Sequence, residues 1–154
     1  MKFLNNSIKV TFLLFSFLFL TGCSKEEVND ETVVNIEGVW QLGRTYGTST
    51  FNGFSANIDG ASEGIFEFRN DGSYENNVIS GSITISIPAL NYSETTPIEA
   101  SFSSGTYLYD ESTDDLVVDG EVSKVVVLNA NFMKVKTLIN DSGTTGEIFT
   151  EFHR

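Results

Sequence analysis

The chain has 154 residues, with 21 acidic and 9 basic side chains and a formal net charge of −12 at pH 7. This negative charge, with no cluster of Lys or Arg to break it, repels phosphate backbones and argues against nucleic acid as a partner. One cysteine and one histidine leave no internal disulfide and too few ligands for a zinc site built on several thiolates or imidazoles.

Residues 1–22 have the zones of a secretory signal. Lys2 and Lys9 supply positive charge, and the run from Val10 to Leu20 is predominantly apolar. This run is shorter than the roughly 20 apolar residues that a transmembrane helix needs. We therefore expect it to be cleaved, which would leave the mature chain more acidic still.

The signal ends in Leu20-Thr21-Gly22-Cys23, which resembles the lipobox recognised by lipoprotein signal peptidase. The resemblance implies cleavage before Cys23, a diacylglycerol on its thiol and further acylation of the new amino terminus. Buried acyl chains contribute about 0.8 kcal/mol per CH₂, so two or more of them anchor a protein durably. We expect a lipid-anchored protein whose one thiol is consumed by the lipid.

Residues 23–33 are the predicted lipidated Cys23 and an acidic tether. Just behind the cysteine, Lys25, Glu26 and Glu27 resemble the export signal of surface lipoproteins of Bacteroidota. The resemblance implies attachment to the outer membrane and display on the cell surface. Attachment at the periplasmic face is the alternative.

From residue 34 to residue 154, apolar and polar residues alternate, which is typical of half-buried β-strands. In the first stretch Ile36, Trp40 and Leu42 share one face, and Thr45 falls on the other. We find no convincing helical period. The later alternating or apolar segments are Phe66–Phe68, Ile83–Ile87, Ile98–Phe102, Tyr107–Tyr109, Val122–Leu128, Phe132–Leu138 and Ile148–Phe152.

Turn signals separate these segments. Asn70-Asp71-Gly72 places a glycine where a tight hairpin needs a positive φ. Residues 110–115, 129–131 and 140–143 are further turn candidates. About eight to ten strands joined locally predict an all-β fold, an antiparallel meander closed into a barrel, with a β-sandwich as the alternative.

Both prolines of the chain, Pro88 and Pro97, fall in the segment 81–104, which is rich in Ser and Thr. Proline cannot donate a hydrogen bond to a sheet ladder. We therefore expect this segment to lie at a sheet edge or to form a long projecting hairpin.

The start of the first strand, Gly38-Val39-Trp40, is similar to the Gly-x-Trp element that opens a lipocalin. Further runs resemble the strands and turns of lipocalin-like domains of bacterial lipoproteins, namely Ile65–Tyr74, Gly105–Asp110 and Asp115–Val118. The resemblance covers most of 36–154 and implies a lipocalin-like barrel of residues 34–154. It also implies structural roles for Gly38, Trp40 and Arg154, with Arg154 of the last strand lying over Trp40.

No catalytic residue is predicted. His153 lies next to the C-terminus with no Ser or Cys framework around it, and nothing selects one carboxylate pair among the many acids. Asp110, Ser112, Asp114 and Glu121 have the spacing of a calcium loop, but Asp115 stands where that loop requires glycine. A solvated hairpin is the favoured interpretation, and weak calcium binding at 110–121 stays open.

Four aromatic residues, Trp40, Phe66, Phe68 and Tyr107, are able to point inward, where they would either fill the barrel or line a cavity for a small apolar ligand. The sequence leaves both outcomes open. We expect a non-enzymatic envelope binding protein without a cofactor, with those four residues as its ligand site. The alternative is an interaction protein that contacts an envelope protein or a glycan through its outer face or the 81–104 hairpin.

Overall fold

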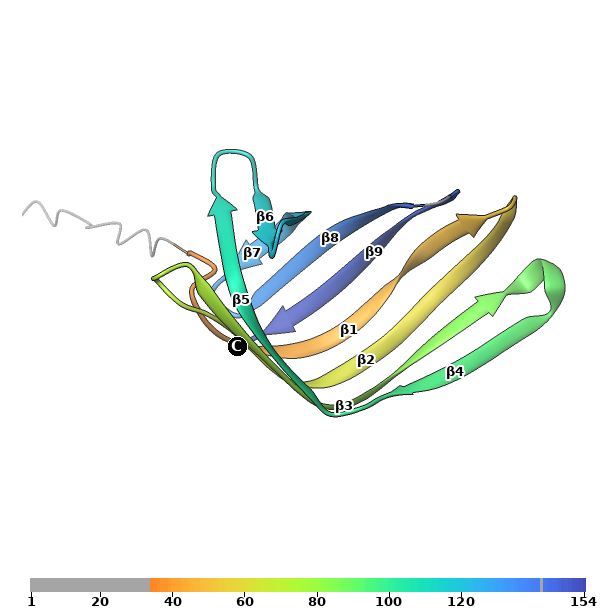
Figure 1. Cartoon of the computed structure of the whole chain (residues 1–154), viewed down its shortest axis with the longest axis horizontal. Helices are drawn as coiled ribbons and strands as arrows, with labels where there is room; N and C mark the ends of the chain where they lie inside the picture. Colours follow the sequence, from red (N-terminus) through yellow and green to blue (C-terminus); the bar gives the residue numbers. More distant parts are fainter. Residues whose placement is uncertain (1–33, 142) are drawn as a thin grey trace, which may run out of the picture. The chain divides into compact units, whose positions relative to one another are not determined.

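Alternation of apolar and polar residues builds nine strands in the part of the chain that the computed structural model describes, residues 34–141 and 143–154 (Figure 1). The predicted signal peptide, Cys23 and the tether with Lys25, Glu26 and Glu27 lie outside the described residues. The strands are β1 (Gly38–Phe51), β2 (Phe54–Phe68), β3 (Ser73–Ile87), β4 (Tyr92–Ile98), β5 (Ser101–Asp110), β6 (Asp115–Val118), β7 (Glu121–Asn129), β8 (Phe132–Asp141) and β9 (Thr144–His153). A short 3₁₀ turn, η1 (Pro88–Leu90), joins β3 to β4. Within the described ranges, no helix has the length and apolar character needed to cross a membrane.

Eight of the strands close into a ring. β1 pairs with both β2 and β9, β3 pairs with both β2 and β5, and β5 to β9 pair in chain order. Every pair is antiparallel, so the predicted all-β meander is confirmed, and closure makes it a barrel rather than a sandwich. β4 pairs with β3 and is the extra strand outside the ring.

The longest strands run past the ring. The first part of β3, Ser73–Val78, pairs with β5, whereas its second part, Gly81–Ile87, pairs with β4. β7 pairs with β8 only as far as Thr137. We call the part with the complete ring the closed half and the extension beyond it, at the right of Figure 1, the open half. The open half comprises the described residues within 45–64, 79–98 and 137–150.

The two prolines lie where a missing N–H group costs little. Pro97 belongs to β4, which is the edge strand of the open half, so the prediction of an edge for this segment is confirmed. Pro88 begins η1, where its fixed φ suits the first residue of a helical turn.

The four predicted turns all connect strands in the structure. In the first of them Gly72 has a φ of 80°, and its N–H donates to the carbonyl of Arg69. Two further hairpin turns were not predicted from the sequence, Asn52-Gly53 and Asp119-Gly120. All four of these residues have positive φ, as two-residue hairpin loops of this kind require.

The closed half is filled by its own side chains. Trp40 and Met133 have no exposed surface, and Phe68 is 2% exposed. The indole N–H of Trp40 donates a 2.7 Å hydrogen bond to the carbonyl of Ile36, so burying it leaves no unpaired donor. The complete core is Ile36, Trp40, Phe68, Tyr74, Leu116, Val125, Met133, Val135 and Phe152.

Trp40 of β1 contacts Arg154, which directly follows β9. The guanidinium carbon of Arg154 lies 3.9 Å from the centroid of the Trp40 ring. A side chain on Gly38, which has a φ of 113°, would be strained and would meet the guanidinium nitrogen Nη2 of Arg154 at 3.4 Å. The same nitrogen donates to the carbonyl of Glu37, which fixes the guanidinium over the ring.

One sequence-based expectation is wrong because β1 contains a bulge. The register between β1 and β2 shifts between Gln41 and Arg44. After this bulge, odd-numbered instead of even-numbered side chains of β1 point into the barrel. Thr45, expected on the face opposite Trp40, instead turns inward, where its hydroxyl lies 3.5 Å from that of Thr150. This reversal places Arg44 on the outer face, directly before the open half.

Candidate functional site

The inner face of the open half carries a row of isoleucines. Residues that pair directly across antiparallel strands point to the same face, and Ile58 of β2 pairs with Ile85 of β3. Every second residue of β2 from Phe68 to Ile58 is at least partly buried, so this face continues from the closed-half core. We call this surface the trough; its isoleucines are Ile58, Ile83, Ile85, Ile87, Ile98, Ile139 and Ile148.

Glycines stand opposite most of these isoleucines on neighbouring strands. The pairs are Gly47 with Ile58 and with Ile148, Gly60 with Ile83, Gly81 with Ile98, and Gly146 with Ile139. A Cβ atom on Gly60 would lie 2.4 Å from the backbone oxygen of Ser82, and one on Gly47 would lie 2.1 Å from that of Glu147. Such contacts are too short to exist. Glycine therefore allows the strands to approach closely at these inner-face positions.

The trough is apolar and partly open to solvent. Ile58 at its floor is 9% exposed, whereas Ile85, nearer the β4 edge, is 41% exposed. In the described part of the open half, the charged residues with inward parity are Glu94 on β4 and Asp141 at the end of β8. A partly exposed apolar surface with its charged groups at its margins suits an apolar or amphipathic ligand better than an ionic one.

A carboxylate and a phenol mark the β4 edge of the trough. Tyr92 and Glu94 share the inward face of β4, and the hydroxyl of Tyr92 donates a hydrogen bond to the carboxylate of Glu94. This bond, followed in size by desolvation, raises the pKa of the Tyr92 hydroxyl. The edge therefore offers polar atoms beside the isoleucines.

Asn76 lies on the inward face of β3, in the closed half, where it pairs with Phe66 of β2 and Ser103 of β5. Its side-chain oxygen Oδ1 is buried and accepts no hydrogen bond from the described residues. Buried acceptors in proteins are nearly always paired. Further along the same face β3 carries the trough isoleucines, so this oxygen is a candidate acceptor for a ligand's donor group once the side chains that cover it move aside.

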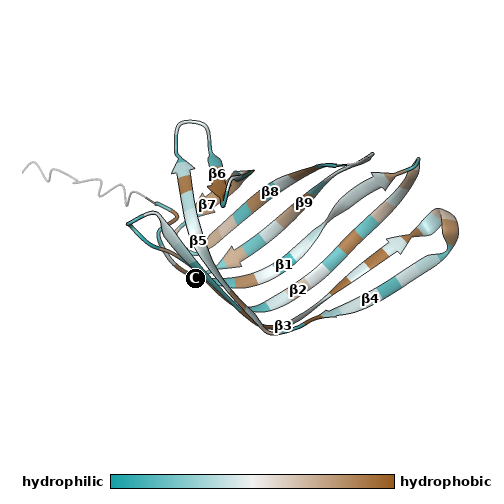
Figure 2. Ribbon diagram, viewed as in Figure 1, coloured by the Kyte–Doolittle hydropathy of each residue, from teal (hydrophilic) through white to brown (hydrophobic). Residues whose placement is uncertain are grey.

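The outer face of the barrel is charged where the closed half meets the open half, in contrast to the trough. Ion pairs cross its strands between Arg44 and Asp59 at 2.8 Å, between Lys136 and Glu147 at 2.7 Å, and between Lys134 and Glu151 at 3.2 Å. The hydrogen bond from Arg44 lowers the pKa of the Asp59 carboxyl. The strands of the open half thus separate an apolar inner face from a polar outer one, and the mixture of residue types is visible along them in Figure 2.

A stacked ring pair lies in the middle of this outer face. The rings of Tyr46 and Phe149 are 5.5 Å apart with an angle of 23° between their planes. They line a shallow groove of about 380 Å³ together with polar side chains that include Arg44, Asn57 and Glu147. Flat rings bordered by polar groups also suit a partner of mixed polarity, such as a sugar.

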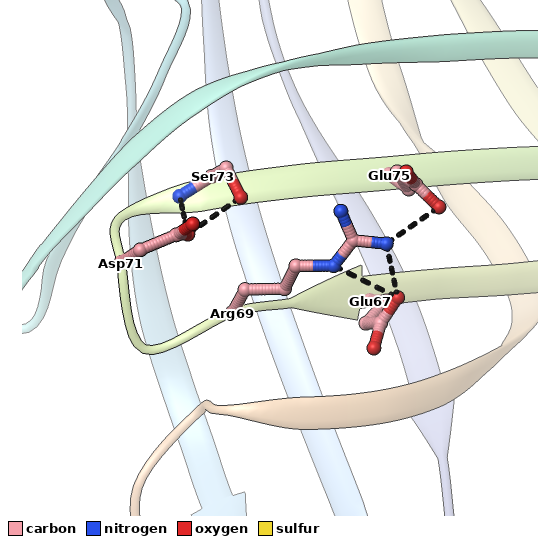
Figure 3. A network of polar contacts seen from close by, with 5 residues as sticks. All are labelled: Glu67, Arg69, Asp71, Ser73 and Glu75. Carbon is pink, nitrogen blue, oxygen red and sulfur yellow. Dashed lines mark hydrogen bonds and ion pairs between the residues drawn. The ribbon is translucent and has the colours of Figure 1, made fainter.

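A second polar network stabilises the turn between β2 and β3 (Figure 3). Arg69 bridges Glu67 at 2.9 Å and Glu75 at 2.7 Å, and the two hydrogen bonds raise the pKa of its guanidinium. Asp71 accepts hydrogen bonds from the backbone and hydroxyl of Ser73, which lower the pKa of its carboxyl. Each group is satisfied within the turn, so we assign this network a structural role.

The four aromatic residues predicted to bind a ligand come together, but in the filled core of the closed half. The ring of Phe68 lies 4.6 Å from that of Phe66 and 4.8 Å from that of Tyr107, and Trp40 is completely buried. Trp40 and Phe68 leave almost no surface for a ligand to contact. The geometry therefore favours the trough over these residues as a binding surface.

The acids with calcium-loop spacing lie around two hairpin turns. Asp110 accepts hydrogen bonds from the backbone and hydroxyl of Ser112, and Asp114 accepts one from Tyr109. In residues 34–141 and 143–154, no group of three or more His, Cys, Asp or Glu side chains is arranged to hold a metal ion.

His153 is exposed, with its ring 5.2 Å from that of Phe132. Nothing in its contacts points to a catalytic arrangement around it.

Comparison of the chain with protein families, characterised proteins and solved structures returns no match.

Proposed function

We propose that the protein is a lipid-anchored, non-enzymatic binding protein of the bacterial outer membrane, displayed on the cell surface, whose trough holds the apolar part of a small amphipathic ligand. The anchor and the address follow from the lipobox-like end of the signal at Cys23 and from Lys25, Glu26 and Glu27 behind it. The observation that carries the binding proposal is the partly exposed isoleucine surface of the trough. Covering such a surface with a ligand contributes about 25 cal/mol per Å² of apolar area removed from water.

The polar atoms on the inward face suggest that the ligand is amphipathic. Oδ1 of Asn76 would accept a hydrogen bond from a hydroxyl or amine, and Glu94 offers a second acceptor at the β4 edge. Between them the isoleucines offer only apolar contact. A chain-like ligand with a hydrogen-bond donor at one end would pair with an acceptor and place its apolar chain on the isoleucines.

The test is binding of the neutral fluorophore N-phenyl-1-naphthylamine to the mature chain carrying Cys23→Ser, which cannot be lipidated. The double change Ile83→Asn and Ile85→Asn should weaken binding by about tenfold or more, because the probe loses apolar contact. Thr84→Asn with Ser86→Asn is the matched control, since these residues of β3 face outward. Equal effects of the two double variants, or no saturable binding by the parent chain, would contradict the proposal.

Asn76 is tested by competition. A medium-chain alcohol and its methyl ether differ only in the hydroxyl donor, so Asn76→Leu should weaken displacement by the alcohol by about threefold to tenfold, the value of one hydrogen bond. Displacement by the ether should change less. If both competitors respond alike, Asn76 does not receive the ligand's donor.

The groove beside Tyr46 and Phe149 favours a second candidate function, contact with a glycan or an envelope protein through the outer face. Binding of the same chain to soluble oligosaccharides, followed by amide chemical shifts, tests it. Phe149→Ala should abolish shifts that Ile85→Asn leaves intact. Shifts at neither site would exclude an outer-face sugar site for the sugars used.

A further inference from the structure

Two neighbouring hairpin tips of the open half expose large apolar side chains. Phe51 and Phe54 flank the turn between β1 and β2 and are 54% and 44% exposed. Leu90 and Tyr92 lie in and just after the turn between β3 and β4 and are also 54% and 44% exposed. Exposed apolar groups gathered at one place mark a contact surface more often than scattered ones do.

The strand register brings the two tips to the same end of the sheet. Asn57, three residues from Phe54, pairs with Ser86, which directly precedes the last residue of β3. η1 also contacts β2, so the second tip lies beside the first. We call Phe51, Phe54, Leu90 and Tyr92 together the tip patch.

Apart from Glu94, which accepts a hydrogen bond from Tyr92, both hairpins lack charge around the patch. No Asp, Glu, Lys or Arg occurs from Thr45 to Ile58 or from Asn76 to Ser93, in a chain of which 19% is charged. The outer side chains there are instead mostly Ser, Thr and Asn. Removing water from an ionic group costs free energy and opposes contact with an apolar medium. These two stretches contain no ionic group, so contact through them carries no such cost.

The tips are also set in defined turns. Asn52 and Gly53 have φ values of 49° and 81°, and Asn91 has a φ of 50° after the proline-initiated η1. Such turns hold the apolar residues in place before any contact, so little ordering cost is added when the patch binds.

We propose that the tip patch inserts into the surface of a zwitterionic lipid bilayer, giving the protein a membrane contact besides its lipid anchor. Phe and Leu would enter the boundary of the acyl region, and Tyr92 would lie at the headgroup level where aromatic residues with a polar end concentrate. The net charge of −12 opposes anionic lipids and favours uncharged or zwitterionic headgroups. Asp141 of the neighbouring β8–β9 tip pairs with Thr144, which pairs with Phe51, so this carboxylate limits how deeply the tips insert.

A second copy of the chain is a poorer occupant. The β4 edge beside the patch carries Pro97 and Glu94, and both residue types oppose pairing of one sheet edge with another. Membrane contact is independent of whether the trough binds a ligand.

The experiment is flotation with phosphatidylcholine vesicles of the mature chain carrying Cys23→Ser, so that no lipid anchor contributes. Phe51→Ser with Leu90→Ser should lower the partition coefficient by about tenfold or more, because two inserted side chains are lost. Leu108→Ser with Val122→Ser is the matched control, since these residues are 67% and 58% exposed but lie in the closed half. This control should float like the parent chain.

The depth to which the tips insert is measured by the quenching of tryptophan fluorescence. The chain's one tryptophan, Trp40, is fully buried, so it supplies a constant background. A tryptophan introduced by Leu90→Trp should be quenched by brominated phosphatidylcholine, whereas one introduced by Leu108→Trp should not be.

Three results would overturn the proposal. The first is failure of the parent chain to float, and the second is an equal loss of flotation in the tip and control variants. The third is a parent chain that forms a dimer and does not bind vesicles, with Phe51→Ser and Leu90→Ser together dissociating the dimer. The trough proposal is tested separately, since Ile83→Asn with Ile85→Asn should weaken fluorophore binding and leave flotation unchanged.

Discussion

The hydroxyl of Tyr74 donates a 2.6 Å hydrogen bond to Oδ2 of Asp119, joining β3 to the turn between β6 and β7. The other carboxylate oxygen of Asp119 accepts a 3.0 Å bond from the backbone N–H of Thr106. A Cβ on Gly105 would lie 2.1 Å from that oxygen, so the contact requires glycine on β5. One carboxylate thereby links β3, β5 and the β6–β7 turn in the closed half.

This contact predicts a pH dependence. The hydrogen bonds from Tyr74 and Thr106 lower the pKa of Asp119 in the folded state below its unfolded value of about 3.9. The stabilisation is therefore complete above that value and is lost as the pH falls through the folded pKa. Tyr74→Phe should reduce the free energy of unfolding at pH 7, and the difference from wild type should shrink near pH 3.

Urea unfolding at the two pH values measures this effect, and NMR titration of the Asp119 carboxyl follows its cause. Tyr109→Phe is the control, because that hydroxyl bonds to Asp114 instead and should leave the Asp119 titration unchanged. A pH-independent difference between Tyr74→Phe and wild type would refute the linkage.

The second prediction concerns Trp40 and Arg154. Trp40→Ala should lower the free energy of unfolding by about 3 to 5 kcal/mol, as large-to-small changes of buried aromatics do. Arg154 is exposed, so its coupling to Trp40 in a double-mutant cycle should be about 0.5 to 1 kcal/mol, the range for exposed cation–π pairs. Lys134→Ala, on the outer face, should be additive with Trp40→Ala. Additivity of Arg154→Ala as well would mean that the contact contributes nothing.

The third prediction tests the close strand approach at the glycines of the trough. Gly60→Val should lower the free energy of unfolding by about 1 to 3 kcal/mol, because β2 and β3 must separate to admit the side chain. Ala61→Val is the matched control on the exposed outer face of the same strand and should change stability by less than about 0.5 kcal/mol. Equal unfolding midpoints for the two variants would count against the close approach.

The fourth prediction is lipidation at Cys23, which follows from the lipobox-like ending of the signal. Labelled palmitate should enter the wild-type protein in cells but not the Cys23→Ala variant, which should accumulate as unprocessed precursor. Mass spectrometry of the mature amino terminus identifies the modification. Label in both proteins would rule out this cysteine as the attachment site.

The fifth prediction concerns the export signal at Lys25, Glu26 and Glu27. Protease added to intact cells should degrade the wild-type protein, whereas replacement of the three residues by alanine should protect it. A periplasmic marker must survive the treatment, to show that the outer membrane is intact. If the wild type survives too, the protein lies on the periplasmic side.

Local chemistry made much of this molecule predictable from its sequence. Period-two alternation identifies strands such as Ile83–Ile87 because neighbouring side chains of any strand point to opposite faces. Asn70-Asp71-Gly72 identifies a turn because the glycine supplies a positive φ. The signal and lipobox are likewise short linear patterns. From Tyr46 to Gly64 the Ser, Thr and Gly residues obscure the alternation, so the sequence alone does not identify the strands of this stretch.

Only the tertiary structure decided which half of the sheet is filled and which is open. Pairing of Gly60 with Ile83, the bulge that turns Thr45 inward, and the placement of the β1–β2 and β3–β4 tips at one end all depend on register between separate strands. Register depends on interactions between residues distant in sequence, and a shift of one residue would exchange the faces. The sequence thus determines that these strands form, whereas their pairing decides that the aromatic residues become core and the isoleucines remain accessible.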